Sequence, residues 1–303
     1  MSRRLVLVVN PGARGAPGSD VGRAAEIAAS SGWEARVEQT DMRGHAFILA
    51  QETAAQGADM VVAVGGDGTV REVAAGLAET GVPMAIVPSG SGNSSYLELF
   101  GTAPWEKTLE AVLAARRAPR AVDLIQLHPT GEYALLGFSA GWFAQVVELA
   151  ARSAASGAAR YVEAAGNAAK EPAHFPATVS ADGVAVANGE LGLVAIGGAR
   201  IRASLFPVFP GSSMDDGLLE LLVVRDTDTA GFNDLLGAVM TGSHLDHPLT
   251  EYRRARSIEI TAPNGMPAEV DGDLWGRDIY SLEVTCAPGA LLVATARGRQ
   301  PGT

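Results

Sequence analysis

The most constraining feature of the sequence is an apolar strand that ends in a glycine-rich loop and leads into a helix. Residues 60–64 read Met-Val-Val-Ala-Val, and Gly65-Gly66-Asp67-Gly68-Thr69 follows directly. A strand that is apolar on both faces is typical of a parallel sheet covered by helices on both sides. The segment therefore predicts an α/β layer with a ligand site at the carboxyl end of this strand.

The first 120 residues or so repeat this alternation of strand and helix. Strands are predicted near residues 4–10, 34–39, 59–64 and 83–87, and helices near residues 20–31, 43–56, 70–80 and 104–117. We interpret residues 1–121 as a doubly wound α/β nucleotide-binding domain. The boundary is expected near residues 118–122, at Ala118-Pro119-Arg120.

The pattern changes after this boundary to short alternating segments separated by turn residues. Residues 122–303 are therefore predicted to form a mostly antiparallel, β-sandwich-like domain, and we leave open a return of the last residues to the first domain. Strands are predicted at residues 122–127, 133–138, 178–186, 191–196, 218–224, 257–260 and 279–284, and helices at 142–170 and 230–240.

Composition narrows the class of protein. The chain has 303 residues, enough for two domains, and 47% of them are apolar, enough for a large core. A net charge of −11 argues against nucleic acid, which is bound by clustered Lys and Arg. The sequence has no run of about 18 apolar residues, so no transmembrane segment is predicted. Cys286 is the only cysteine, so no intramolecular disulfide can form, and a cytoplasmic location is expected.

Polar, glycine-rich loops follow three of the predicted parallel strands. They comprise residues 10–15, 65–69 and 88–95. Loops at the same edge of one sheet are better explained by a shared nucleotide than by independent turns. Glycines let the backbone approach phosphates, and the helix after residue 69 offers free N–H groups, while Thr69 and Glu72 have the spacing of a capping box. The chain has neither a P-loop motif nor the protein-kinase Asp-Phe-Gly.

Six motifs give these loops a family context. They are Asn10-Pro11, Thr40, residues 65–72, Pro88-x-Gly-Ser-Gly-Asn93, residues 215–219 and Asp271-Gly272-Asp273. Over nearly its whole length the sequence resembles the diacylglycerol-kinase and sphingosine-kinase type of lipid kinase, particularly the compact bacterial members. NAD kinases share the Gly-Gly-Asp-Gly-Thr loop and the fold, but the continuation Arg71-Glu72-Val73 looks like lipid kinases. The resemblance implies an NAD-kinase-like first domain and transfer of a phosphoryl group from ATP to a lipid hydroxyl.

The resemblance also implies roles for individual residues. The nucleotide would be held by Asn10, Thr40, Gly65, Gly66, Asp67, Gly68, Thr69 and Ser91. A Mg²⁺ ion would lie at Asp216 with the backbone oxygens of Ser213 and Leu218, and hard oxygen ligands suit this ion. Asp67 and Asp273 are the candidate catalytic residues. The family usually has Glu where this chain has Asp273, and Asp where it has Ser94.

These departures and the unknown acceptor keep two alternatives open. The chain could be a kinase of the NAD kinase superfamily acting on a soluble acceptor, or a catalytically silent lipid- or nucleotide-binding homologue. For the lipid kinase, we expect a lipid partner at a membrane surface, peripheral membrane contact and, from the family, a homodimer. The acceptor lipid, diacylglycerol-like or sphingoid-like, is not specified by the sequence.

Three other segments carry weaker functional interpretations. Arg253, Arg254 and Arg256 are predicted to be a solvated strand edge, with attraction to anionic membrane as the alternative. The pair His244-x-x-His247 is a weak zinc candidate because no cysteine accompanies it. The apolar, proline-broken run at residues 205–210 is either part of an acyl-chain cleft or ordinary core.

Overall fold

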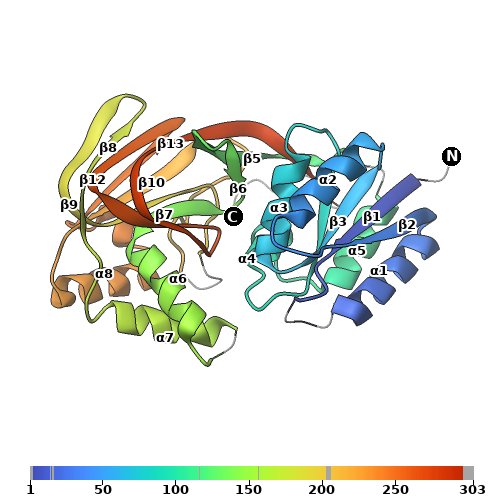
Figure 1. Ribbon diagram of the computed structural model, residues 1–303, viewed down its shortest axis with the longest axis horizontal. Helices are drawn as coiled ribbons and strands as arrows, with labels where there is room; N and C mark the ends of the chain where they lie inside the picture. Colours follow the sequence, from blue (N-terminus) through green and yellow to red (C-terminus); the bar gives the residue numbers. More distant parts are fainter. Residues whose placement is uncertain are drawn as a thin grey trace. The chain divides into compact units, whose positions relative to one another are not determined.

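The computed structural model describes residues 3–13, 15, 17–115, 117–155, 157–202 and 206–295. The chain divides into two compact units, Met1–Val122 together with Gly289–Thr303, and Asp123–Pro288. Figure 1 shows the helices and strands of both units. In the described part of the chain, no helix has the length and apolar character needed to cross a membrane.

The first unit is built on a parallel sheet. Its elements are β1 (Arg3–Val9), α1 (Pro17–Ser30), β2 (Trp33–Gln39), α2 (His45–Ala55), β3 (Met60–Gly65), α3 (Asp67–Leu77), β4 (Met84–Pro88), α4 (Ser94–Phe100) and α5 (Trp105–Ala114). The strands pair in the order β4-β3-β1-β2, all parallel. The end of the chain joins them, because Val293 pairs in parallel with Met84 beside β4.

Helices cover both faces of this sheet, which explains why its central strands are apolar throughout. Leu5, Leu7 and Val9 of β1 belong to a core cluster with residues of α1 and α5. The alternate residues Val6 and Val8 are also buried, and α2 packs against β1 and β3 from its own side. Burial of both faces therefore produces the period-free apolar runs seen in the sequence.

The second unit is mostly antiparallel, and β5 and β13 span its boundaries with the first. Its elements are β5 (Arg120–His128), β6 (Glu132–Ala134), β7 (Gly137–Gly141), α6 (Trp142–Arg152), α7 (Ala158–Ala168), β8 (Phe175–Ala181), β9 (Val184–Gly197), β10 (Leu219–Arg225), α8 (Thr229–Thr241), the 3₁₀ helix η1 (His244–Asp246), β11 (Thr250–Ala255), β12 (Ser257–Val270) and β13 (Asp273–Val293). The predicted fold class, α/β followed by an antiparallel β-sandwich-like domain, is confirmed.

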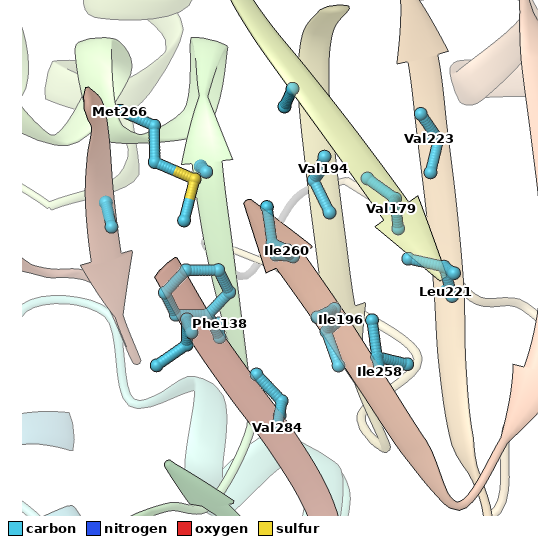
Figure 2. Packing of buried hydrophobic residues seen from close by; sticks show 14 of the residues in the cluster. Phe138, Val179, Val194, Ile196, Leu221, Val223, Ile258, Ile260, Met266 and Val284 are labelled. Carbon is cyan, nitrogen blue, oxygen red and sulfur yellow. The ribbon is translucent and has the colours of Figure 1, made fainter. Parts of the chain in front are cut away.

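Two long strands connect the layers of the second unit. β9 pairs with β8 through its first half and with β7 and β10 through its second half, and β12 pairs with β8, β7 and β13. Figure 2 shows the core that these strands enclose, with Phe138, Val194 and Ile260 among its members. The opposite face of β9 and β10 packs against α6 and α8 through Leu193, Leu222 and other apolar residues.

Three of the element predictions for this unit are wrong. Residues 133–138 are divided between β6 and β7, and the other two errors lie at positive-φ residues. Residues 142–170 form α6 and α7 rather than one helix, and Gly157, at φ 61°, separates them. Residues 178–186 are a hairpin rather than one strand, because Asp182 (φ 48°) and Gly183 (φ 76°) form its turn. Both breaks lie at residues suited to positive φ, which an Ala-rich or alternating pattern conceals.

The predicted capping box of Thr69 and Glu72 is also wrong. Helix α3 begins at Asp67 after Gly66, and no side chain caps it. The Glu72 carboxylate instead accepts the backbone N–H groups of Gly44 (2.9 Å) and Ala46 (3.2 Å) at the start of α2. Glu72 therefore ties α2 to α3 from a position 26 residues away in the chain.

Replacing Glu72 with Ala should lower the free energy of unfolding by about 1–2 kcal/mol, because two N–H groups at the start of α2 lose their acceptor. Urea denaturation followed by circular dichroism measures the change. Glu52→Ala is the matched control, since Glu52 is an exposed residue of α2. Equal stability of the two variants would contradict the capping role.

Candidate functional site

Four loops at the carboxyl edge of the parallel sheet are joined by backbone hydrogen bonds. The N–H of Asn10 donates to Val64 (3.0 Å), and that of Thr40 donates to Val9 (2.9 Å). The N–H of Ser89 donates to Gly65 at 2.9 Å. The loops that follow β1, β2, β3 and β4 therefore start from one fixed edge, as expected for a shared ligand site.

Side chains extend these links into the loops. Asn10 donates its Nδ2–H to the Thr69 hydroxyl (3.2 Å) and accepts the N–H of Gly12 (2.9 Å). Asn93, in the left-handed conformation at φ 56°, accepts the N–H of Gly90 at 2.9 Å. The side chains of Asn10 and Asn93, in the loops after β1 and β4, are thus used largely to shape these loops.

Glycine is required where the loops touch. A Cβ built on Gly90 would overlap the Cα of Gly66, and one on Gly66 would lie 3.2 Å from the Cα of Gly90. A Cβ on Gly15 would lie 2.7 Å from the Ser89 carbonyl oxygen, which accepts the Gly15 N–H. Side chains are excluded from these contacts, so the loop backbones pack directly against one another.

Asp67 holds the start of α4. Its two carboxylate oxygens accept the N–H groups of Ser94 (3.1 Å) and Ser95 (2.8 Å). A carboxylate at a helix N-terminus is stabilised by the helix dipole as well as by these bonds. The predicted catalytic acid therefore has a structural role, linking the loop after β3 to the loop after β4.

The remaining predicted nucleotide residues lie at the same edge. Thr40 follows β2 and is half-buried, and Ser91 is half-buried in the loop between β4 and α4. Gly65 ends β3, while Gly68 and Thr69 lie in the first turn of α3. Their proposed contacts with a nucleotide remain predictions.

In the second unit, Asp271 and Gly272 form the turn between β12 and β13. Both have positive φ, 50° and 87°, and Val270 pairs with Asp273 across the turn. The Asp271 carboxylate is buried and accepts three backbone N–H groups, those of Leu135 (2.7 Å), Leu136 (2.8 Å) and Gly137 (2.8 Å). Asp271 thus anchors the turn, and Asp273 is the first residue after it.

The predicted metal ligands Ser213, Asp216 and Leu218 lie on the turn before β10. One Asp216 oxygen accepts the Leu218 N–H (3.1 Å), and the other pairs with the Arg254 guanidinium. Among the described residues, no group of three His, Cys, Asp or Glu side chains is placed to hold a metal ion. In this arrangement a cation at Asp216 would have to compete with Arg254. The metal assignment remains a prediction.

The sequence reasoning missed Asp123, a residue of β5 that holds this turn in place. From β5 its carboxylate accepts the N–H of Gly217 at 2.7 Å, and its own N–H donates to Met214 at 2.7 Å. A lone acid within the apolar strand 121–125 was the available signal.

Burial, together with Asp123 and Asp216, raises the pKa of the Cys286 thiol to about 12, so this cysteine remains protonated at neutral pH.

The second unit also contains an apolar pocket. Its lining includes Trp142, Phe143, Leu193, Phe206, Leu222 and Phe232, all from or beside α6, α8 and the outer face of β9 and β10. Trp142 is 2% exposed, and within the described part of the chain its Nε1–H has no hydrogen-bond partner. Phe206 and Val208 of the run 205–210 line this pocket, whereas Leu205 lies outside the described residues.

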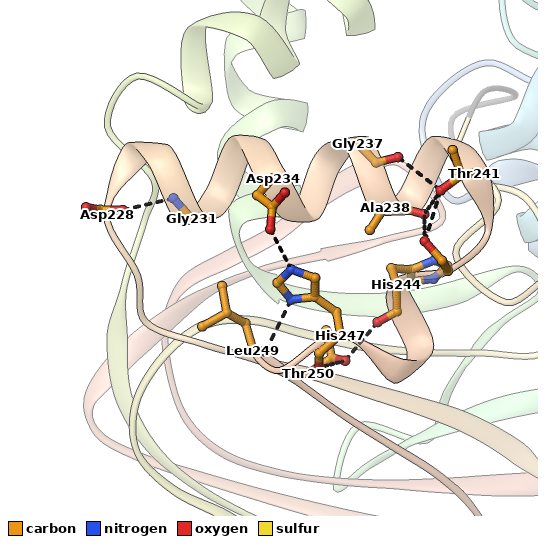
Figure 3. A network of polar contacts seen from close by, with 11 residues as sticks. Asp228, Gly231, Asp234, Gly237, Ala238, Thr241, His244, His247, Leu249 and Thr250 are labelled. Carbon is orange, nitrogen blue, oxygen red and sulfur yellow. Dashed lines mark hydrogen bonds and ion pairs between the residues drawn. The ribbon is translucent and has the colours of Figure 1, made fainter.

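The weaker candidates have ordinary structural partners. Figure 3 shows the contact of His247 with Asp234 (3.1 Å). The His244 ring makes a separate contact, with the Val208 carbonyl at 2.8 Å. They therefore do not form a zinc pair. Of the arginine cluster on β11, Arg254 pairs with Asp216 and Glu220, and the side chain of Arg253 lies exposed near Glu251.

Comparison with known proteins identifies two matching family models. The model described as the diacylglycerol kinase catalytic domain matches residues 4–127. The model described as the YegS C-terminal NAD kinase beta sandwich-like domain matches residues 137–295. Together these matches cover the parallel sheet with its loops and the antiparallel unit.

Individual relatives agree with these matches. A probable lipid kinase YegS-like of Pseudomonas fluorescens is 29% identical over 300 residues, covering 97% of this chain and 96% of the relative. A diacylglycerol kinase of Staphylococcus carnosus is 23% identical over 254 residues, covering 82% of this chain and 80% of the relative. The crystal structure of a diacylglycerol kinase from Bacillus anthracis superposes with a TM-score of 0.73 at 19% identity, covering 97% of both chains.

Replacing Gly90 with Ala should destabilise the loop edge by about 1–3 kcal/mol, because the new methyl group would overlap Gly66 and force the two loops apart. Chemical denaturation measures the loss. Gly22→Ala is the matched control, since its Cβ would enter open space on α1 and Ala favours the helix. A Gly90→Ala variant as stable as the wild type would show that the loops are not in close contact.

Proposed function

Because the chain belongs to the diacylglycerol kinase and YegS-like lipid kinase family, we propose that it transfers the terminal phosphoryl group of ATP to the hydroxyl of a diacylglycerol-like or sphingoid-like lipid. The observation that carries the proposal is the edge of the parallel sheet, where glycine backbones from three loops meet without intervening side chains. Such an edge suits a polyphosphate, whose charge is bound by backbone N–H groups and helix N-termini.

The donor is proposed to bind as the magnesium complex of ATP. Gly65, Gly66 and Gly68 would lie along the phosphates, with the N-terminus of α3 directed at them and Thr69 held in place by Asn10. Magnesium accompanies the nucleotide as part of the substrate and neutralises its charge. Thr40 and Ser91 are proposed to complete the nucleotide contacts from the loops after β2 and β4.

The acceptor is proposed to be a lipid because the second unit offers an apolar pocket with one buried polar donor. The lining is apolar, and burial of hydrocarbon stabilises binding by about 25 cal/mol per Å². The space inside it is about 20 Å³, so the lining side chains would have to separate for a hydrocarbon chain to enter. The unpartnered Nε1–H of Trp142 suits an ester or hydroxyl oxygen near the polar end of such a molecule. A soluble acceptor such as NAD would leave this lining unused.

Asp273 is the better candidate for the general base, the group that accepts the proton of the lipid hydroxyl. Both oxygens of Asp67 already accept backbone N–H groups of α4, and these bonds orient the carboxylate towards the helix. We therefore assign Asp67 to shaping the nucleotide loops and Asp273 to the proton transfer. A carboxylate in that role contributes roughly 10²–10⁴-fold to the rate.

The first test is turnover of MgATP by the purified protein with a panel of micelle-dispersed lipids. Asp273→Asn should lower kcat by about 100-fold or more, because an amide cannot accept the proton. Asp67→Asn should fold but lose nearly all turnover, because one of the Ser94 and Ser95 N–H groups then faces an NH₂ group. The control is Asp246→Asn, at an exposed aspartate.

Each outcome of this assay separates the functional classes. Lipid-dependent turnover that is lost in the Asp273 variant supports the lipid kinase and its base. Turnover with NAD alone would assign the chain to the soluble-acceptor class. ATP binding with no turnover on any acceptor would favour a silent homologue, and wild-type turnover in both variants would refute the two assigned roles.

The pocket is tested by filling it. Val239→Phe adds bulk to a lining residue on α8 and should raise KM for a long-chain lipid by about tenfold, leaving KM for ATP unchanged. Val162→Phe makes the same change at an exposed position on α7, away from the lining, and should leave both constants unchanged. Unaltered lipid kinetics in the Val239 variant would show that the acceptor does not enter this pocket.

A further inference from the structure

A buried ion pair lies directly behind the turn that precedes Asp273. Glu269 is 1% exposed and Arg202 is 6% exposed, and the guanidinium Nη2 of Arg202 pairs with one Glu269 oxygen. The other Glu269 oxygen accepts the backbone N–H of Gly272 at 2.8 Å. One carboxylate thus connects a buried cation with the second residue of the Asp271-Gly272 turn.

Both partners of this pair are themselves fixed by the fold. Glu269 lies on β12 opposite Ser139 of β7 and Leu274 of β13. Arg202 exchanges backbone hydrogen bonds with Phe206, at 2.8 and 2.9 Å, and a Cβ on Gly137 would overlap its Nη1. The same Cβ would lie 2.5 Å from the Ile196 carbonyl oxygen, so position 137 is restricted to glycine and the Arg202 guanidinium packs closely against it.

The pair is poorly explained by stability alone. Within the part of the chain that the structure describes, the Arg202 Nη1 and the neighbouring Ser139 hydroxyl have no hydrogen-bond partner. Burying two charges costs several kcal/mol of desolvation for each ion, and replacing such pairs with apolar residues is often neutral or stabilising. A buried pair with an unpartnered donor therefore calls for a role other than stabilising the fold.

We propose that Arg202 and Glu269 are positioning residues that set the geometry of Asp273 for proton transfer, an inference that rests on the proposed kinase function. Asp271 fixes the turn from one side through three N–H groups, and Glu269 fixes its other residue through the Gly272 N–H. Arg202 holds the Glu269 carboxylate in the orientation that makes this bond. The main chain that leads into Asp273 is then held by hydrogen bonds at both residues of the turn.

Precise positioning matters here because Asp273 carries its carboxylate on a single methylene. A shorter side chain reaches less far, so its placement depends more strongly on the backbone that carries it. Misplacement of a reacting group by about 1 Å can lower a rate by about 100-fold. The turn between β12 and β13 therefore helps to determine where the Asp273 carboxylate lies.

Two double variants separate the hydrogen bond from the charge. Arg202→Met with Glu269→Gln removes both charges but keeps an oxygen that can accept the Gly272 N–H. Arg202→Met with Glu269→Met removes the charges and the acceptor at similar volume. Neither leaves a single buried charge, so both should fold. Val179→Ala, a core change in β8, controls for a general loss of stability.

The readouts are kcat, the KM values for MgATP and lipid, and the exchange rate of the Gly272 N–H in protein labelled with ¹⁵N-glycine. The Met/Met variant should lose about 10- to 100-fold in kcat with both KM values within about threefold, and Gly272 should exchange at least about tenfold faster. The Met/Gln variant keeps an acceptor but loses the guanidinium that orients it, so its kcat and its Gly272 exchange should lie between those of the Met/Met variant and the wild type. The Val179 variant should keep kcat.

Equal kcat in the two double variants would overturn the proposal, as would Gly272 exchange that does not respond to loss of the acceptor. Failure of the underlying function has a different signature, namely a wild-type protein that phosphorylates no acceptor. In that case the exchange comparison still applies, and equal exchange in the two variants would refute the turn geometry independently of activity.

Discussion

The contact between the backbones of Gly66 and Gly90 determines what the sheet edge can do. Two loops from adjacent parallel strands approach until neither can carry a side chain, and Gly15 meets the Ser89 carbonyl in the same way. Because no side chains intervene, the loops are held together by direct main-chain packing and by main-chain hydrogen bonds such as Ser89 to Gly65 and Gly15 to Ser89. The positions of the loop backbones are therefore set by the sheet and not by side-chain rotamers.

Several acidic side chains in this protein act as acceptors for the main chain. Asp67 holds α4, Glu72 holds α2, Asp123 holds the turn before β10, and Asp271 holds the loop before β7. Each bond joins segments far apart in the sequence, so the carboxylates connect distant parts of the chain within the fold. Hydrogen bonds to charged groups contribute about 1.5–3 kcal/mol each, more than neutral ones, which makes acids effective in this role.

The sequence predicted the sheet well because burial on both faces leaves a strong pattern. β3 and β4 were located to within a residue or two from their apolar runs and following glycines, and the antiparallel unit was recognised from its short alternating segments. The helix break at Gly157 and the hairpin turn at Asp182-Gly183 were missed. In both cases a positive-φ residue interrupts an otherwise uniform pattern, and local composition outweighed it.

What could not be predicted is the use to which each motif residue is put. Spacing along the chain paired Glu72 with Thr69, whereas the fold pairs it with α2. The ion pair between Asp216 and Arg254 could not be foreseen from the sequence either. Such contacts arise only after strands and helices are assembled, so no local rule contains them. The roles of the motif acids are therefore set by the assembled fold, as the main-chain hydrogen bonds of Asp67 and Asp271 show.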